Sequence, residues 1–122
     1  MQVEAREIES LGQKLKLTKP EIDALIEIIA DLKISWPGAT FKLFGSKIKG
    51  FAEEESDLDL LIMLPCAVTE EIRRKIIHKV FDINLTFETN ISPLIMSEKE
   101  WGRPPFSLLP IHAFIEEEGI DL

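Results

Sequence analysis

Two aspartates one residue apart stand at the head of an apolar run. Asp57 and Asp59 are followed by Leu60-Leu61-Ile62-Met63. Residues i and i+2 of a strand point to the same face, so the two carboxylates are expected side by side at the start of a buried strand. Hard cations such as Mg²⁺ bind oxygen ligands, often one or two carboxylates together with substrate phosphates. The pair therefore predicts a magnesium site that takes a phosphorylated substrate, with Asp57 and Asp59 as metal ligands.

A Gly-Ser pair precedes these aspartates, at the end of another apolar run. Glycine lets the backbone approach a ligand closely, so Gly45 and Ser46 could offer a backbone N–H and a hydroxyl to phosphate oxygens. Lys47 and Lys49 follow directly and supply positive charge for a triphosphate, and Lys42 is a further candidate. The expected nucleotide-binding residues are therefore Gly45, Ser46, Lys47 and Lys49.

The combined pattern is Gly45-Ser46-Lys47-Ile48-Lys49-Gly50, followed by Ser56-Asp57-Leu58-Asp59. It resembles the nucleotidyltransferase superfamily of DNA polymerase beta and kanamycin nucleotidyltransferase. Chain length and layout are most similar to the minimal nucleotidyltransferases, single-domain proteins often encoded beside a helical partner. Two segments of the tail, 92–101 and 115–120, also resemble that group, and the resemblance covers roughly residues 20 to 122.

The resemblance implies that three carboxylates on adjacent strands hold two Mg²⁺ ions. Asp57 and Asp59 match the first two of these carboxylates, and the residues at all three positions are expected to be catalytic. Relatives usually have aspartate at the third position, where Asn90 aligns here. An asparagine can offer a carbonyl oxygen to Mg²⁺, but it has no charge and cannot act as a base, so the second metal is in doubt. Glu88 and Asp82 are the nearest alternative acids, and the sequence does not decide among the three.

The resemblance implies transfer of a nucleoside monophosphate from a nucleoside triphosphate, with ATP as the first candidate, to a hydroxyl. The acceptor suggested by the minimal group is a tyrosine of a helical HEPN-type toxin, with the nucleotidyltransferase as antitoxin. The alternative is a weakened or inactive relative that binds a nucleotide and a partner, favoured by Asn90. A third alternative is an α/β domain in which the aspartates only begin a strand, although aspartate is depleted in strands. The acceptor, the base preference and homo-oligomer formation stay open.

The composition limits the kinds of binding partner and the cellular compartment that we expect for this chain. Fourteen basic against twenty-two acidic residues give a net charge of −8, which argues against an extended nucleic-acid surface. The single cysteine, Cys66, excludes an internal disulfide and fits a reducing cytosol. The sequence shows neither a secretory signal nor an apolar run long enough for a membrane helix, so a cytoplasmic protein without a membrane partner is expected.

The expected fold is α/β, more closely α+β: one domain, 1–122, with helices packed on a small mixed, largely antiparallel sheet. Thr18 and Glu21 fit a capping box, Thr69 is a plausible N-cap, and Pro93 marks an edge strand or a bulge. The short loop between strands 39–44 and 57–64 predicts that they pair antiparallel. Further strands are expected at 90–97 and 120–122, helices at 1–17 (weakly anchored), 18–35, 70–87 and 109–118, and a short turn or helix at 98–101.

Overall fold

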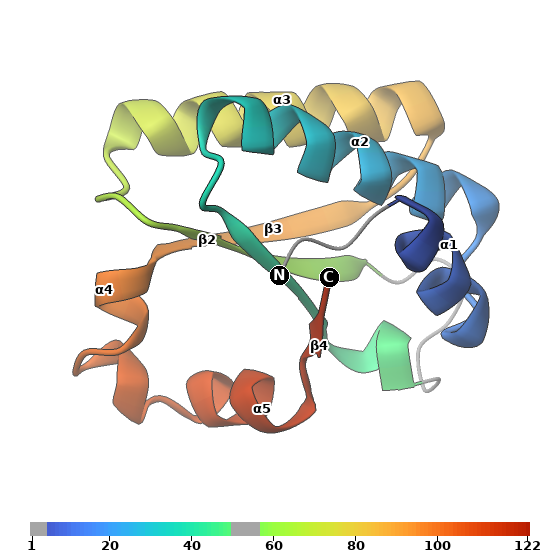
Figure 1. The fold of residues 1–122 in the computed structure, drawn as a ribbon. Helices are drawn as coiled ribbons and strands as arrows, with labels where there is room; N and C mark the ends of the chain where they lie inside the picture. Colours follow the sequence, from blue (N-terminus) through green and yellow to red (C-terminus); the bar gives the residue numbers. More distant parts are fainter. Residues whose placement is uncertain (1–4, 50–56) are drawn as a thin grey trace.

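The structure of the chain, a computed structural model, describes residues 5–49 and 57–122. It contains both helices and strands, with the helices packed on the sheet (Figure 1), which confirms the predicted α+β class. In chain order the elements are α1 (Ala5–Lys14), α2 (Lys19–Ser35), β1 (Thr40–Phe44), the 3₁₀ helix η1 (Ser46–Lys49), β2 (Leu58–Leu64), α3 (Glu70–Phe87), β3 (Ile91–Ser97), α4 (Glu98–Trp101), the 3₁₀ helix η2 (Phe106–Leu108), α5 (Pro110–Glu118) and β4 (Ile120–Asp121).

Two long helices form a layer on one face of the sheet. α2 and α3 lie side by side there, and α1 packs against α2 (Figure 1). Each helix buries an apolar stripe at helical spacing, and the odd residues of β1 and the even residues of β2 meet these stripes. The shared core includes Ile22, Leu25, Ile29, Phe41, Leu43, Leu58, Leu60, Ile62, Ile76, Val80 and Ile83.

The predicted helix starts are present as hydrogen bonds. The Glu21 backbone N–H donates to Thr18 Oγ1 at 3.2 Å, and the Thr18 N–H donates to Glu21 Oε1 at 2.9 Å, which completes the capping box of α2. The Ile72 N–H donates to Thr69 Oγ1 at 3.2 Å and caps α3 in the same way. The N-terminal helix ends at Lys14, before the predicted end at residue 17, and Ile8 anchors it with 3% of its surface exposed. Residues 1–4 lie outside the described part.

Within these ranges the sheet has four strands in the order β3-β2-β1-β4. β1 pairs antiparallel with β2, as the short connection predicts, and antiparallel with β4. β3 pairs parallel with β2, after the chain has crossed over through α3. β2 is therefore a central strand, in agreement with its continuous apolar run. The parallel pair matters for the site, because it brings the first residues of β2 and β3 to the same end of the sheet.

The outer edge of β3 is closed by α3. The side-chain amide of Asn84 accepts a hydrogen bond from the Ile91 N–H at 3.0 Å and donates one to the Ile91 carbonyl at 2.9 Å. Arg73 donates from Nη1 to the Ile95 carbonyl at 3.2 Å, so this arginine is not simply a solvated surface residue. Pro93, between these two positions, has no N–H to offer. The prediction of an edge strand at Pro93 is confirmed, and side chains of α3 satisfy part of this edge.

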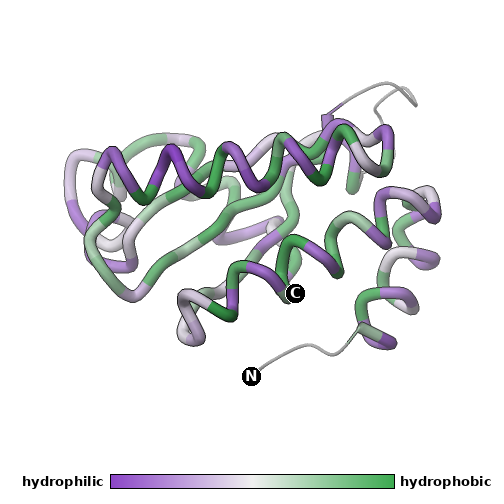
Figure 2. Tube along the Cα trace, turned by 90° about the horizontal axis from the view of Figure 1, so that it is seen from above, coloured by the Kyte–Doolittle hydropathy of each residue, from purple (hydrophilic) through white to green (hydrophobic). Residues whose placement is uncertain are grey.

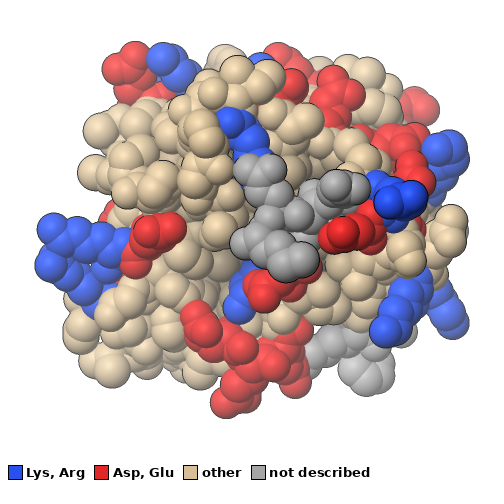
Figure 3. All heavy atoms as spheres, viewed as in Figure 1, with Lys and Arg blue, Asp and Glu red and all other residues tan. Residues whose placement is uncertain are grey.

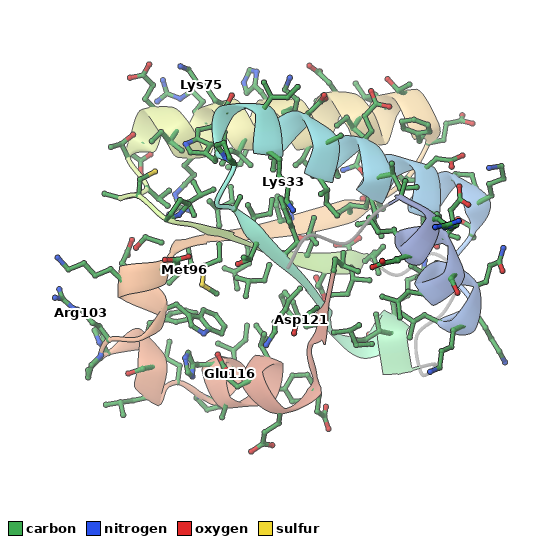
Figure 4. All side chains as sticks on the ribbon, in the orientation of Figure 1. Lys33, Lys75, Met96, Arg103, Glu116 and Asp121 are labelled. Carbon is green, nitrogen blue, oxygen red and sulfur yellow. The ribbon has the colours of Figure 1, made fainter. Side chains whose placement is uncertain are left out.

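A smaller layer covers part of the opposite face of the sheet. α4, η2 and α5 form an arm there, and Figure 4 shows Met96 and Glu116 turned toward the space between arm and sheet. Trp101 is the centre of this layer: its indole N–H donates to Glu116, and the ring of His112 lies 4.4 Å from its own, centroid to centroid. The arm packs on Phe44 and Leu61 through Trp101 and Ile115. Among the described residues, no helix is both long and apolar enough to span a bilayer.

Candidate active site

The two aspartates lie where β2 begins. Asp59 is the second residue of β2, and Asp57 directly precedes the strand. Leu58 and Leu60 point into the core under α2 and α3, whereas Leu61 packs on the opposite face beneath the arm. Alternation along the strand therefore puts Asp57 and Asp59 on the face that the arm covers only in part. The predicted side-by-side placement of the carboxylates follows from this backbone.

The Gly-Ser pair meets this site from the neighbouring strand. Phe44, the last residue of β1, is in register with Asp59, so Gly45 comes next to the Asp59 side chain. Gly45 has φ +92°, and a Cβ at this position would collide with the Asp59 carboxylate. Both the conformation and the space require glycine here. The contact between Gly45 and Asp59 brings the Gly-Ser and Asp-x-Asp segments together at one end of the sheet.

Asn90 enters the site from β3. Its backbone carbonyl accepts the Leu58 N–H at 3.0 Å, which extends the parallel pairing of β2 and β3 by one residue. Its side-chain Nδ2 donates to Asp57 Oδ1 at 2.6 Å. A half-turn of the Asn90 amide would exchange this donor for the carbonyl oxygen, the atom that a metal ion would bind. Asn90 thus lies beside the aspartate pair, at the place where the third carboxylate was expected.

The two alternative acids lie elsewhere. Glu88 is the exposed C-cap of α3, with φ 55° and ψ 46°. Asp82 lies inside α3, on the groove between α2 and α3, and this layer covers the face of the sheet opposite to the aspartates. Neither makes a described contact with Asp57 or Asp59. The geometry favours Asn90 as the third member of the site, while its role stays a prediction.

The electrostatics of the pair favour a cation. Burial, and then the charge of Asp57, raise the pKa of Asp59 above its ordinary value. Among the described side chains, which do not include that of Lys49, no lysine or arginine forms a salt bridge with either carboxylate. A bound Mg²⁺ would supply the missing positive charge, and two carboxylate groups with an amide oxygen are hard ligands that suit it. No group of three or more His, Cys, Asp or Glu side chains that could hold a metal occurs in the described residues.

Two lysines that were predicted to bind phosphate, Lys47 and Lys42, form ion pairs with acidic side chains of this chain. Lys47 lies in η1, and its Nζ is 2.6 Å from Glu21 Oε2, with only 13% and 8% of the two side chains exposed. The structure thus places this ammonium on α2, and a phosphate contact of Lys47 stays a prediction. Lys42 pairs with Asp121 of β4 at 3.7 Å. Ser46 is exposed at the start of η1, directly after Gly45. The Lys49 side chain and Gly50 lie outside the described part.

The sequence reasoning missed Ser92. This serine is in register with Asp59 on β3, and alternation places it on the same face as Asn90 and the aspartates. Its hydroxyl is partly exposed and adds a donor and an acceptor to the floor of the site. The signal was present in the sequence, because Ser92 is the i+2 neighbour of Asn90, just as Asp59 is of Asp57.

A mixed sheet with a Gly-Ser turn against an Asp-x-Asp pair, and a third polar residue on the adjoining strand, defines the nucleotidyltransferase class of palm-like domains. Residues 5–93, well over half of the chain, match the family described as poly(A) RNA polymerase, mitochondrial-like, central palm domain. The chain belongs to this family. The match confirms the resemblance to nucleotidyltransferases that the motifs indicated. No curated protein and no solved structure matches the chain.

Proposed function

We propose that the chain transfers a nucleoside monophosphate from a nucleoside triphosphate, ATP being the first candidate, to a hydroxyl group. The acceptor oxygen forms a bond to the α-phosphorus, the bond from that phosphorus to the bridging oxygen breaks, and pyrophosphate leaves. The hydroxyl proton passes to solvent or to a nearby base. The observation that carries the proposal is the contact of Gly45 with Asp59, next to Asp57 and Asn90 at one end of the sheet.

Each residue has a role in this scheme. Asp57 and Asp59 would hold Mg²⁺, and the Gly45-Ser46 turn would present a backbone N–H and a hydroxyl to the triphosphate. Mg²⁺ held there would stabilise the charge that develops on the attacking and leaving oxygens. Asn90 would offer an amide oxygen but cannot accept the proton of the attacking hydroxyl. Nucleotide binding and nucleotidyl transfer can therefore be measured separately, because Asn90 can support the first but cannot act as a base in the second.

The experiment is calorimetry of nucleotide binding in the presence of Mg²⁺. Asp57→Asn and Asp59→Asn should each abolish the metal-dependent part of binding, because the triphosphate charge would face an incomplete metal shell. Asp82→Asn, on the α3 side facing α2, is the matched control and should bind as the wild type does. Equal affinity in all three variants would show that the aspartate pair is not the metal site.

A second candidate function is a weakened relative that binds nucleotide and a partner but transfers slowly. Asn90 beside Asp57 favours it, because general-base assistance is typically worth about 10²–10⁴ in rate. Asn90→Asp should then raise the transfer rate with little change in nucleotide affinity. A wild type with a fast rate that Asn90→Asp does not improve would rule this candidate out.

For the acceptor, we propose a tyrosine of a helical HEPN-type protein, in an antitoxin role. This proposal rests on the similarity of motifs and tail to the minimal nucleotidyltransferases. The test incubates the chain with α-labelled ATP, Mg²⁺ and the helical protein encoded by a neighbouring reading frame, with a Tyr→Phe variant of that protein as control. Label that stays on the Phe variant, or that never reaches the protein, would refute the proposed acceptor.

A further inference from the structure

The outer flank of α3 carries three large apolar side chains in a row. Ile77, Phe81 and Leu85 follow one another at i, i+4 and i+8, and 45%, 60% and 63% of their surfaces are exposed. Such spacing places side chains on one face of a helix, one turn apart. Single exposed apolar residues are ordinary on a protein surface, whereas a continuous apolar stripe marks an interaction site. We name Ile77, Phe81 and Leu85 the α3 stripe.

The stripe is separate from every face of α3 that the fold already uses. Ile76, Val80 and Ile83 pack on the sheet, and Arg73 and Asn84 bind the edge of β3. Figure 2 shows α3 along one margin of the helical layer, with α2 on its inner side only. Among the described elements none covers the α3 stripe, although the helix is firmly held by the other faces.

Two opposite charges frame the stripe symmetrically. Arg74 lies about two helical turns before Phe81, and Glu88, the left-handed C-cap that directly follows α3, lies at the same sequence separation after it. Both are exposed, and within the described part of the chain neither forms a salt bridge. Along the chain, this flank therefore carries a basic residue, the three apolar residues of the α3 stripe and an acidic residue, with Phe81 at the centre.

This pattern is complementary to itself in one orientation. If two copies of α3 pack antiparallel about a two-fold axis at Phe81, Ile77 meets Leu85 of the other copy, and Arg74 meets Glu88 twice. In a parallel pair like charges would oppose each other at both ends, which is unfavourable. A two-fold contact uses the same patch on both subunits, as this patch allows. We propose that the α3 stripe is a homodimer interface in which α3 packs antiparallel on α3 of a second copy.

The test is sedimentation equilibrium of the full chain from about 10 µM to about 1 mM, a range that covers the weak end expected of a small, single-helix interface. The wild type should dimerise, and Phe81→Asp should weaken dimerisation at least about tenfold, because it puts a charge at the centre of the contact. Leu108→Asp is the matched control: this leucine of η2 is 77% exposed but lies outside α3, and its variant should dimerise as the wild type does.

Charge reversal tests the orientation. Arg74→Glu and Glu88→Arg should each weaken the dimer, because each places like charges opposite one another, and the double reversal should restore it. A wild type that stays monomeric throughout the range would overturn the proposal and leave the stripe to a different partner. A dimer that tolerates Phe81→Asp, or that the double reversal fails to restore, would overturn it as well.

Discussion

Asp59 is held in a place that is unfavourable for a carboxylate. It is partly buried in β2, lies against the backbone of Gly45, and has the charge of Asp57 beside it. Burial and this neighbouring charge raise the pKa of Asp59, so its carboxyl group ionises less readily in the folded chain than in the unfolded chain. Such a position is more easily explained by a bound cation than by stability, since functional sites often carry perturbed carboxylates.

The sign of this effect gives a prediction at neutral pH. Because the folded pKa lies above the ordinary value of 3.8, the free energy of unfolding falls as pH rises from there through the folded pKa. Asp59→Asn removes the titrating group, so without Mg²⁺ the variant should be more stable than the wild type at about pH 7. The difference should shrink as pH falls toward the ordinary value.

Urea unfolding in EDTA at several pH values measures this difference. Repeating the series with Mg²⁺ supplies the control, because a ligand that binds only the folded state should stabilise the wild type and not the variant. A variant that is less stable than the wild type at neutral pH in EDTA would contradict the argument.

At the scale of elements, the N-terminus of α2 and the 3₁₀ helix η1 are joined by one side chain. Glu21 closes the capping box with Oε1 and binds Lys47 with Oε2. The pair is almost fully buried, and removal of one partner of a buried pair leaves an uncompensated charge. η1 follows Gly45 directly, so this ion pair holds the segment that carries the Gly-Ser turn.

Lys47→Met should therefore lower the free energy of unfolding by about 3–5 kcal/mol. Glu21→Gln should have a similar effect while it keeps the capping box, since glutamine also serves at this position. The double variant should recover most of the loss, and chemical denaturation of the four proteins gives the coupling energy. If the Lys47→Met protein has normal stability but binds nucleotide weakly, the Lys47 ammonium of the wild type contacts phosphate instead.

Local signals in the sequence predicted most of these elements. Thr18, Thr69 and Pro93 each determine a helix start or a strand edge through their own backbone chemistry, so their roles could be read without a structure. The aspartate pair and Gly45 were predictable for the same reason, as alternation and a short loop bring them together. The pairing of Lys47 with Glu21 was not, because it depends on how α2 and η1 pack. The role of Asn84 was not predictable either. Its side-chain amide makes the two hydrogen bonds with the Ile91 backbone that a neighbouring strand would otherwise make.

At the scale of the whole molecule, the name of the family suggests an RNA substrate, whereas the net charge of the chain argues against RNA binding. The matching family is named for a poly(A) RNA polymerase, and that name concerns an RNA. This chain carries a net charge of −8. On the face shown in Figure 3, basic side chains are scattered among acidic ones and form no continuous stripe. Binding an RNA strand depends on neutralising several phosphates with lysine and arginine, whereas one triphosphate needs only a metal ion and a few donors.

We therefore predict that the chain binds Mg–nucleotide but not an RNA strand. Fluorescence anisotropy with a labelled oligoadenylate should show no binding at about 0.15 M salt, because a net charge of −8 disfavours contact with the phosphate backbone and this salt concentration screens the attraction of scattered lysines and arginines. Mg–ATP should bind under the same conditions, and the Asp57→Asn protein distinguishes specific from adventitious nucleotide binding. Affinity for the oligoadenylate that falls steeply with salt would reveal a phosphate-binding surface and return RNA to the acceptors under test. If the oligoadenylate does not bind, a small molecule or a protein hydroxyl is left as the acceptor to be tested.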